Sequence, residues 1–398
     1  MLRFLTAGES HGRGLVGIIE SFPAGFEISI EAVNHQLSRR QTGFGRGKRM
    51  RIENDRVTIL SGIRHGQTLG SPISILIENK DWPNWKDAMD AGVPVPHDHN
   101  RNGKQVRPVI TTPRPGHADL AGGIKYHTHD LRNVLERASA RETAARVACG
   151  AIARQLLEYF DIQLASHVLA IGKTKLGQKR VSFLEIVEKS DSSPVRCVDS
   201  DTSARMVAEI KKAIDDGDTL GGVFEVRAVN LPVGLGSPAQ WFARLDGTLA
   251  AAVMSIPSVK AVEIGDGFLS SRKRGSRVHD QIYFESSAAS IRRKHFVRRT
   301  NNAGGIEGGM TNGEELVVRA ACKPIATLLH PLDSVDILTK SLAKGAVERS
   351  DVCIVPSAAV VGEAMVALAL ASAFTDKFGH DSRTEIEANF RAYLEREF

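Results

Sequence analysis

Alanine-rich helical stretches constrain the fold of this 398-residue chain more than any other feature of its sequence. Within residues 134–156, small and apolar residues recur every three or four positions, which is the period of an α-helix. Alanine is the strongest helix former, and its short side chain lets neighbouring elements approach closely. The predicted alanine-rich helices span residues 127–161, 238–255 and 358–374. We therefore expect a closely packed group of helices at the centre of the molecule.

Predicted strands are rich in β-branched residues and end at glycine, proline or asparagine. They span residues 13–22, 56–63, 72–78, 162–175, 221–231 and 315–323. Further helices are predicted at residues 29–41, 203–216 and 384–395. Because strands and helices do not alternate as regular βαβ units, the pattern favours an α+β fold over a doubly wound sheet. We expect a single domain over residues 1–398, in which the unpatterned residues 79–113 form a lid or insertion.

Composition narrows the class of protein. The net charge of +6 is mild, and the basic excess is local, which argues against a genome-binding protein. The four cysteines are far apart and form no C-x-x-C pair, as expected for reduced thiols in a cytosolic protein. The amino terminus has no signal-peptide pattern. Gly362 and Glu363 interrupt the apolar run at 358–374, so we expect a core helix in a soluble cytoplasmic protein with no membrane partner.

Residues 39–51 form the most cationic segment, with five arginines, one lysine, three glycines and no acidic residue. Arginine suits bidentate recognition of phosphate or carboxylate, and glycine lets the backbone approach a ligand closely. The segment fits a small polyanionic ligand, a solvated basic loop or a nucleic-acid patch. It is not a P-loop, because Arg49 follows Lys48 and Thr42 stands where the first glycine belongs. Few aromatics interleave with the basic runs, so we expect no nucleic-acid partner.

Two loop histidines are the main candidates for proton transfer. His11 lies between glycines just before a predicted strand, and His117 lies in a proline-bounded loop beside Arg114. A histidine in a loop can act as acid or base near neutral pH. Together with the arginine segment and the Arg349-Ser350-Asp351 triplet, these loops indicate an active site.

Other polar and aromatic residues are interpreted as structural. The i,i+2 pairs His97/His99 and His127/His129 lack a third ligand at metal spacing, so no metal site is expected. Asp119 is interpreted as a loop cap, and Trp82 and Trp85 as lid or subunit contacts.

Four motifs, in this order, resemble those of the chorismate synthases: residues 8–12 (GESHG), 40–49, 137–143 (RASARET) and 349–351 (RSD). The resemblance runs from Met1 to beyond Ala371. It implies a carbon–oxygen lyase of the shikimate pathway, which leads to the aromatic amino acids. Such an enzyme forms chorismate from 5-enolpyruvylshikimate 3-phosphate by anti-1,4-elimination of phosphate and the carbon 6 proton, with reduced FMN. The resemblance also implies a β-α-β sandwich, with long central helices between antiparallel sheets, and a homotetramer.

Matched by position, the resemblance implies roles for three ionisable residues and two hydroxyls. His11 matches the histidine that protonates the departing phosphate. His117 matches the one that protonates, or holds protonated, the region of the reduced flavin. Asp351 matches an aspartate near flavin nitrogen 5, where it assists removal of the carbon 6 proton. Ser10 and Ser139 match hydroxyls that support this network.

The resemblance also implies two binding sets. The substrate set consists of arginines that surround the phosphate and carboxylates: Arg40, Arg46, Arg49, Arg114, Arg141 and Arg349. The flavin set is Arg137, Ala138, Ser139, Pro257, Ser258, Gly308, Lys323, Pro324, Ile325, Ala326, Thr327 and Arg349. If NAD(P)H serves as reductant, Arg40 and Arg46 are the candidates to bind it. The sequence leaves open whether the enzyme reduces its own flavin, as a flavin reductase does, or depends on another reductase.

Four residues, at three sites, depart from the family pattern. Ser21 stands where Gly or His is usual, and Val352 follows Asp351 where Pro is frequent. The pair Pro257-Ser258 replaces a common Asn-Ala pair and removes one backbone donor at an implied flavin contact.

Overall fold

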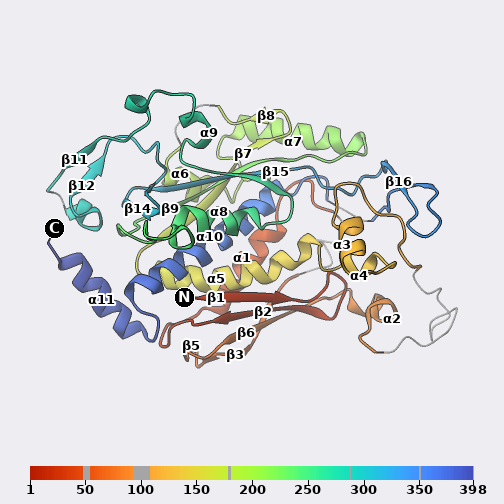
Figure 1. Ribbon diagram of the computed structural model, residues 1–398, viewed down its shortest axis with the longest axis horizontal. Coiled ribbons are helices and arrows are strands. Elements are labelled where there is room, and N and C mark those ends of the chain that lie inside the picture. The colour runs from red at the N-terminus through yellow and green to blue at the C-terminus, as the bar shows by residue number, and fades with distance from the viewer. Residues whose placement is uncertain (48–53, 93–107, 178–180, 287, 349–350, 398) are drawn as a thin grey trace.

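Two antiparallel sheets enclose a layer of helices in the computed structural model, which describes residues 1–47, 54–92, 108–177, 181–286, 288–348 and 351–397 (Figure 1). The first sheet has the strand order β1-β2-β6-β3, and the second β10-β15-β9-β7-β8. The first comprises β1 (Arg3–Ala7), β2 (Gly14–Glu20), β6 (Ile73–Glu78) and β3 (Val57–Ser61). The second comprises β10 (Val259–Ile264), β15 (Leu316–Cys322), β9 (Gly222–Val229), β7 (Gln163–Ile171) and β8 (Thr174–Lys175).

Long helices fill the space between the sheets. These are α1 (Ile30–Gln41), α5 (Thr143–Tyr159) and α10 (Val355–Phe378). Helix α5 packs against β2 and β6 of the first sheet, whereas α10 packs against β7 and β9 of the second, and the two helices contact each other along their length. This arrangement confirms the expected α+β sandwich with central helices between antiparallel sheets.

Glycine permits close packing at each interface of this sandwich. A Cβ at Gly17 of β2 would lie 2.7 Å from the sulfur of Cys149 on α5. A Cβ at Gly150 of α5 would lie 2.4 Å from the Cβ of Ala364 on α10. One at Gly362 of α10 would lie 2.5 Å from the ring of Phe224 on β9. The small residues predicted to allow close approach therefore set the spacing of the layers.

The remaining elements surround this core. The helices are α2 (Lys86–Met89), α3 (Asp119–Lys125), α4 (Arg132–Leu135), α6 (Phe183–Lys189), α7 (Ser200–Asp215), α8 (Leu245–Met254), α9 (Gly267–Ser270) and α11 (Arg383–Glu395). The 3-10 turns are η2 (Trp82–Asn84), η3 (Ala140–Glu142), η4 (Trp241–Ala243), η5 (Gly275–Arg277) and η6 (Ala288–Arg293). The short strands are β4 (Ile63–Arg64), β5 (Gln67–Thr68), β11 (Ile282–Phe284), β12 (Phe296–Arg298), β13 (Ile306–Glu307), β14 (Met310–Thr311), β16 (Asp333–Val335) and β17 (Leu342–Lys344).

The predicted helix at 127–161 is wrong in its first half. The chain forms α4 there, then the short turn η3, and only then α5. Ser139 has an extended backbone (φ −66°, ψ 141°), and its hydroxyl accepts a hydrogen bond from the N–H of Arg141. The periodic pattern continues across this break because residues before and after it are both buried. The predicted helix at 238–255 likewise starts too early, since Arg244 is extended and α8 begins at Leu245.

Other expectations agree closely with the structure. Helix α1 is capped by Ser29, whose side chain accepts from the N–H of Ala32. Helix α10 is long and apolar enough to cross a bilayer, but 89% of its most apolar window is buried inside the protein, which confirms a core helix.

Within the predicted lid, η2 and α2 give local structure to residues 82–89. Residues 93–107 lie outside the described chain, so the lid stays a prediction.

Ser21 has a φ of 58°, in the left-handed region where glycine is the least strained residue. This explains why glycine suits that position.

Candidate active site

A cavity of about 390 Å³ opens where helices α5 and α10 begin. Thr143, the first residue of α5, and Ile354, the N-cap of α10, both line it. Partial positive charge at the amino-terminal end of a helix favours anions. Arg40, in the last turn of α1, lies in the same wall. The fold therefore directs two helix dipoles and an arginine into one space.

His11 enters the cavity from the loop between β1 and β2. Gly8 starts this loop with a φ of 101°, and a Cβ there would lie 2.3 Å from the carbonyl oxygen of Gly14, so only glycine fits the turn. The ring nitrogen Nδ1 of His11 lies 2.9 Å from both carboxylate oxygens of Glu136. The neighbouring hydroxyl of Ser10 accepts a hydrogen bond from the hydroxyl of Ser139 at 3.2 Å. Both serines line the cavity, as their predicted supporting role requires.

His117 lies in another wall, held by Asp119. Its Nδ1 is 2.5 Å from Oδ1 of Asp119. The guanidinium of Arg114 donates to both oxygens of Asp119, at 2.9 and 3.1 Å, and to the hydroxyl of Thr327 at 3.0 Å. Burial alone would raise the pKa of Asp119, but hydrogen bonds from His117 and Arg114 lower it below its ordinary value. Asp119 therefore stays ionised and does more than cap a loop.

Two arginines of the substrate set share one buried carboxylate. Arg141 donates from Nη1 to both oxygens of Asp55, at 2.6 and 2.7 Å. Arg40 lies 3.6 Å from Asp55 and donates to the hydroxyl of Thr143 and the carbonyl of Ala140. Burial lowers the pKa of Arg40 to about 9, although Asp55 opposes this effect. Because two cations share one anion, this corner of the cavity keeps an excess of positive charge.

Arg46 and Asp351 meet at the start of α10. Their side chains form an ion pair at 2.8 Å, and the N–H of Gly47 donates to Asp351 at 2.6 Å. The carbonyl of Gly45 accepts the N–H of Val352 at 2.8 Å. The arginine segment is thus joined to residues 351–352 by backbone as well as side-chain contacts.

Most of the implied flavin set also lines the cavity: Ala138, Ser139, Pro257, Ser258, Lys323, Pro324, Ile325, Ala326 and Thr327. The N–H of Lys323 donates to the carbonyl of Ser258 at 2.9 Å, which brings two of these segments together. The Nζ of Lys323 donates to the carbonyl of Gly116.

Pro257 fits its backbone position. The N–H of Val259 donates to the carbonyl of Ile256 at 3.1 Å, and Ser258 has a φ of 73°. This is the pattern of a type II turn, in which proline is favoured at the second position and a positive φ is required at the third. The missing N–H of Pro257 is therefore no loss to the turn.

Two of the implied residues that the structure describes, Arg137 and Gly308, are not among those that line the cavity. Arg137 instead donates to the carbonyls of Gly8 and Thr6 at 3.2 and 2.8 Å, so it braces the His11 loop. Gly308 lies in the turn between β13 and β14, with a φ of 58°. Arg49 and Arg349 lie outside the described residues.

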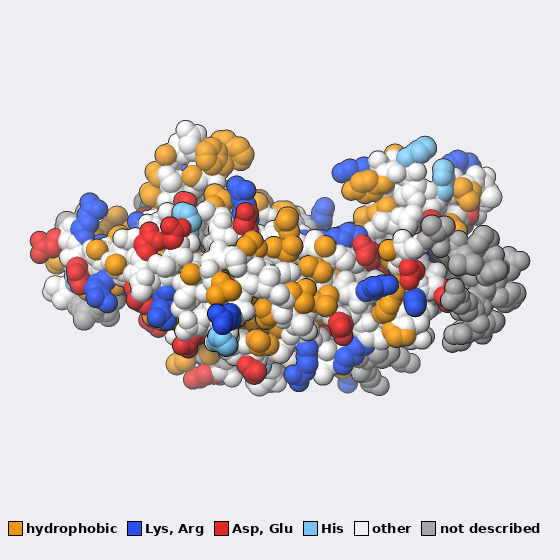
Figure 2. Space-filling model, turned by 90° about the horizontal axis from the view of Figure 1, so that it is seen from below, with side chains coloured by type: hydrophobic (Ala, Val, Ile, Leu, Met, Phe, Trp, Pro, Cys, Tyr) orange, Lys and Arg blue, Asp and Glu red, His pale blue; other side chains and the backbone are white. Residues whose placement is uncertain are grey.

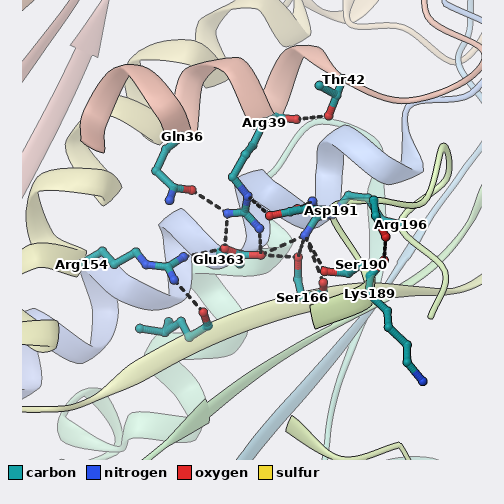
Figure 3. Close-up of polar contacts among 12 residues, drawn as sticks. Gln36, Arg39, Thr42, Arg154, Ser166, Lys189, Ser190, Asp191, Arg196 and Glu363 are labelled. Carbon is teal, nitrogen blue, oxygen red and sulfur yellow. Dashed lines mark hydrogen bonds and ion pairs between the residues drawn. The ribbon is translucent and has the colours of Figure 1, made fainter. Parts of the chain in front are cut away.

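Arg39 has a structural role, although it belongs to the cationic segment. Its guanidinium donates to both oxygens of the buried Glu363, at 2.7 and 2.9 Å, and to Asp191 at 2.9 Å. Figure 3 shows Glu363 at the centre of this network, approached by Arg39 from α1 and by Arg154 and Arg196 from other sides. The countercharge of Arg39 is therefore protein carboxylate, and the network fixes the end of α1 that carries Arg40.

Several partners of the candidate residues escaped sequence reasoning. Glu136, Asp55 and Asn79 contact His11, Arg40 or Arg141, yet the residues in each pair are up to 125 positions apart. The one available signal was local, since Glu136 directly precedes the RASARET motif.

Comparisons with known proteins agree with this geometry. The family model described as chorismate synthase matches residues 2–375. A chorismate synthase of Symbiobacterium thermophilum is 54% identical over 396 residues, covering 99% of each chain. One of Solibacter usitatus is 53% identical over 401 residues, covering 100% of this chain and 99% of the relative. A solved structure described as chorismate synthase superposes with a TM-score of 0.77 at 41% identity, covering 99% of this chain and 97% of that one.

Proposed function

This chain belongs to the chorismate synthase family and converts 5-enolpyruvylshikimate 3-phosphate to chorismate in the shikimate pathway, and we propose that it does so in the cavity where α5 and α10 begin. The observation that carries this proposal is the convergence of His11, His117 and Asp351 on that cavity. These residues come from three distant parts of the chain, and four arginines lie in the same walls.

The arginines are proposed to bind the substrate. Its phosphate and two carboxylates need several cations in a space that excludes water. Arg40, Arg46, Arg114 and Arg141 supply them, and each is already oriented by a carboxylate of the protein. An anion that binds beside Arg40 would favour its charged form, against the effect of burial. The helix ends of α5 and α10 add to the same attraction.

The cavity also fits the cofactor of this family, which is reduced FMN. Apolar side chains of Leu135, Ile354 and Val361 share the walls with Ser139, Ser258 and Lys323, and such a mixture suits a flat ring that carries polar edges. We propose that Ala138, Ser139, the Pro257-Ser258 turn and residues 323–327 hold it. When bound, reduced FMN lends electron density to the substrate and takes it back, so that no net redox change occurs.

Proton transfer is assigned to the chain's own residues. We propose that His11 donates a proton to the departing phosphate, which improves it as a leaving group. His117, held by Asp119, keeps a proton near the cofactor. Asp351 assists removal of the carbon 6 proton once substrate or cofactor occupies the cavity.

An anaerobic assay tests the proposal. Substrate and dithionite-reduced FMN should give phosphate and chorismate in equal amounts. Loss of both products when Arg40→Ala or Arg114→Ala replaces the wild type would support the cavity, whereas unchanged kinetics in both folded variants would contradict it. The same assay with NAD(P)H in place of dithionite tests whether the chain reduces its own flavin.

A homotetramer is also proposed, and the outer face of the first sheet supports it. Leu5 and Ile18 are 71% and 37% exposed and pair directly across β1 and β2. Figure 2 shows hydrophobic side chains gathered in the middle of the face seen from below, where this sheet lies in Figure 1. An apolar face of this kind is usually covered by another protein surface, and identical subunits most often associate symmetrically.

The four cysteines are free and buried, which supports the proposed cytoplasmic location.

A further inference from the structure

His11 is fixed by two residues that come from distant parts of the chain, Glu136 and Trp85. We infer that both are positioning residues for His11: Glu136 sets the tautomer of its ring, and Trp85 holds the plane of that ring. The inference rests on the proton role proposed above for His11. Neither residue belongs to the implied catalytic, substrate or flavin sets.

Glu136 makes a three-point contact with the His11 loop. Its two carboxylate oxygens each lie 2.9 Å from Nδ1 of His11, and Oε2 also accepts the backbone N–H of His11 at 2.9 Å. Its own carbonyl accepts the N–H of Ser10 at 3.0 Å. The carboxylate is only 1% exposed. A single residue therefore fixes both the backbone and the ring of His11.

The charge of Glu136 determines which ring nitrogen acts. Burial opposes ionisation, but the hydrogen bonds and charge of His11, with help from Arg132, lower the pKa of Glu136 below its ordinary value. An ionised carboxylate can only accept hydrogen bonds, so Nδ1 carries the proton in that contact. Any proton that His11 delivers to the substrate must then leave from Nε2. After the transfer, His11 remains in the tautomer that can be reprotonated at the same nitrogen.

Trp85 covers one face of the imidazole. The two ring centroids are 3.7 Å apart and the planes differ by 22°. The indole is 6% exposed, and its Nε1 donates to Asp81 at 2.9 Å. Stacking on an indole restrains rotation of the imidazole. This gives a residue from the predicted lid segment a direct contact with the proposed acid.

The charged groups around His11 act in opposite directions. Glu136 is the anion in direct contact with the ring, at Nδ1. The guanidinium carbon of Arg132 lies 5.2 Å from the centroid of the Trp85 ring, and Arg132 is itself paired with Glu136 at 3.3 Å. Asp81, which accepts the indole N–H at the edge of the same ring, is opposite in charge to Arg132. Because the nearest charge dominates, Glu136 determines the tautomer of the His11 ring.

Glu136→Gln is the decisive variant, because it keeps the size of the side chain and removes its charge. We expect kcat to fall by about 10²- to 10⁴-fold, because neutralising a carboxylate that orients a catalytic histidine impairs its proton transfer. The KM for substrate should change by less than about threefold, because the interaction acts on the transition state.

Trp85 is tested by a pair of variants. Trp85→Phe keeps an aromatic plane and should retain most of the activity, whereas Trp85→Ala should lower kcat at unchanged pH dependence. If the Phe and Ala variants are equally impaired, stacking is not the role of Trp85.

Glu225→Gln is the matched control. Glu225 forms a second buried histidine–carboxylate pair, with His167 at 3.1 Å, among strands outside the cavity. The Glu225→Gln variant should be less stable than the wild type, but its kcat should be unchanged. A folded Glu136→Gln enzyme with wild-type kcat overturns the inference. Full activity of His11→Ala would instead remove the proposed acid itself, so the two failures are distinguishable.

Discussion

At the scale of single residues, the chemistry depends on pairs that only the folded chain brings together. The histidines and arginines themselves could be predicted, because loops rich in glycine and proline and a dense arginine segment are visible in sequence. Their carboxylate partners could not. Asp55 serves both Arg40 and Arg141, and nothing in its own surroundings in the sequence marks it. Asp119 was predicted to cap its loop, and its carboxylate does accept the backbone N–H of Arg114 at 3.0 Å, but it also contacts His117.

His117→Ala tests the second histidine at this scale. Turnover should fall by about 10²- to 10⁴-fold, the usual contribution of a group that transfers a proton. Folding should be preserved, because Arg114 still binds Asp119 through its Nε at 2.9 Å. Steady-state kinetics with reduced FMN, together with a thermal melt, would check both points. A folded variant with full turnover would remove His117 from the mechanism.

At the scale of elements, the central helices are where sequence and structure agree best. Alanine-rich stretches marked α5, α8 and α10, since close helix packing requires small side chains. The break before α5 was missed for a physical reason. Burial preserves the apolar period through Val134 and Ala145, although Ser139 leaves the helical conformation between them. That break is what turns Ser139 and Arg141 toward the cavity.

Gly150→Ala tests the contact between α5 and α10. Alanine is favoured over glycine in a helix by about 1 kcal/mol. The new Cβ, however, would lie 2.4 Å from the Cβ and 2.6 Å from the Cα of Ala364. Since backbone cannot move away cheaply, overpacking of about 1–3 kcal/mol should win. Urea unfolding should show a lower midpoint.

Gly177→Ala is the control for that experiment, because a Cβ at Gly177 meets no atom within 4 Å. Equal urea midpoints for Gly150→Ala and Gly177→Ala would mean that α5 and α10 can move apart to accommodate the added methyl group at little cost.

Glu363→Gln tests the network that fixes the end of α1. Glu363 is 2% exposed and contacts three arginines, whose charges keep its pKa below the ordinary value despite burial. Neutralising it leaves buried cations without their anion, which typically costs about 3–5 kcal/mol. We expect a lower melting temperature and a weaker substrate affinity, because Arg40 follows Arg39 directly. An unchanged melting temperature would show that Asp191 alone suffices.

At the scale of the whole molecule, the layered architecture could be predicted in outline but not in connectivity. Strands at 162–175, 221–231 and 315–323 were identified. Their order in the second sheet, and the joining of β10 to its edge, depend on contacts between residues far apart in sequence. The meeting of α5 and α10 at one cavity follows from that topology.

Acid should destabilise the fold through its buried carboxylates. Burial raises the pKa of Glu225, but His167 and Arg227 outweigh it and lower the value from 4.5 to about 2. A carboxyl whose pKa is depressed on folding stabilises the protein above its unfolded pKa, and this contribution is lost as pH falls from about 4.5 towards 2. Its size is on the order of 3 kcal/mol. In thermal melts between pH 2 and 7, the difference in melting temperature between wild type and Glu225→Gln should shrink towards the acidic end. A difference in melting temperature that does not depend on pH would contradict this assignment.

Self-association should depend on the exposed face of the first sheet. Leu5→Glu places a charge opposite Ile18. Burying that charge in an interface between subunits would be costly. Sedimentation velocity should show smaller species than for the wild type. Leu184→Glu changes a leucine that is 62% exposed on α6 and should leave the assembly intact. Identical sedimentation of both variants would place the interface elsewhere.

The central claim is that His11, in the cavity between the ends of α5 and α10, supplies the proton to the departing phosphate. Phosphate release by His11→Ala in an anaerobic single turnover, with dithionite-reduced FMN and saturating substrate, tests it most directly. The expected rate is about 10²- to 10⁴-fold below that of the wild type, with the cofactor still bound. Release at the wild-type rate would contradict the claim.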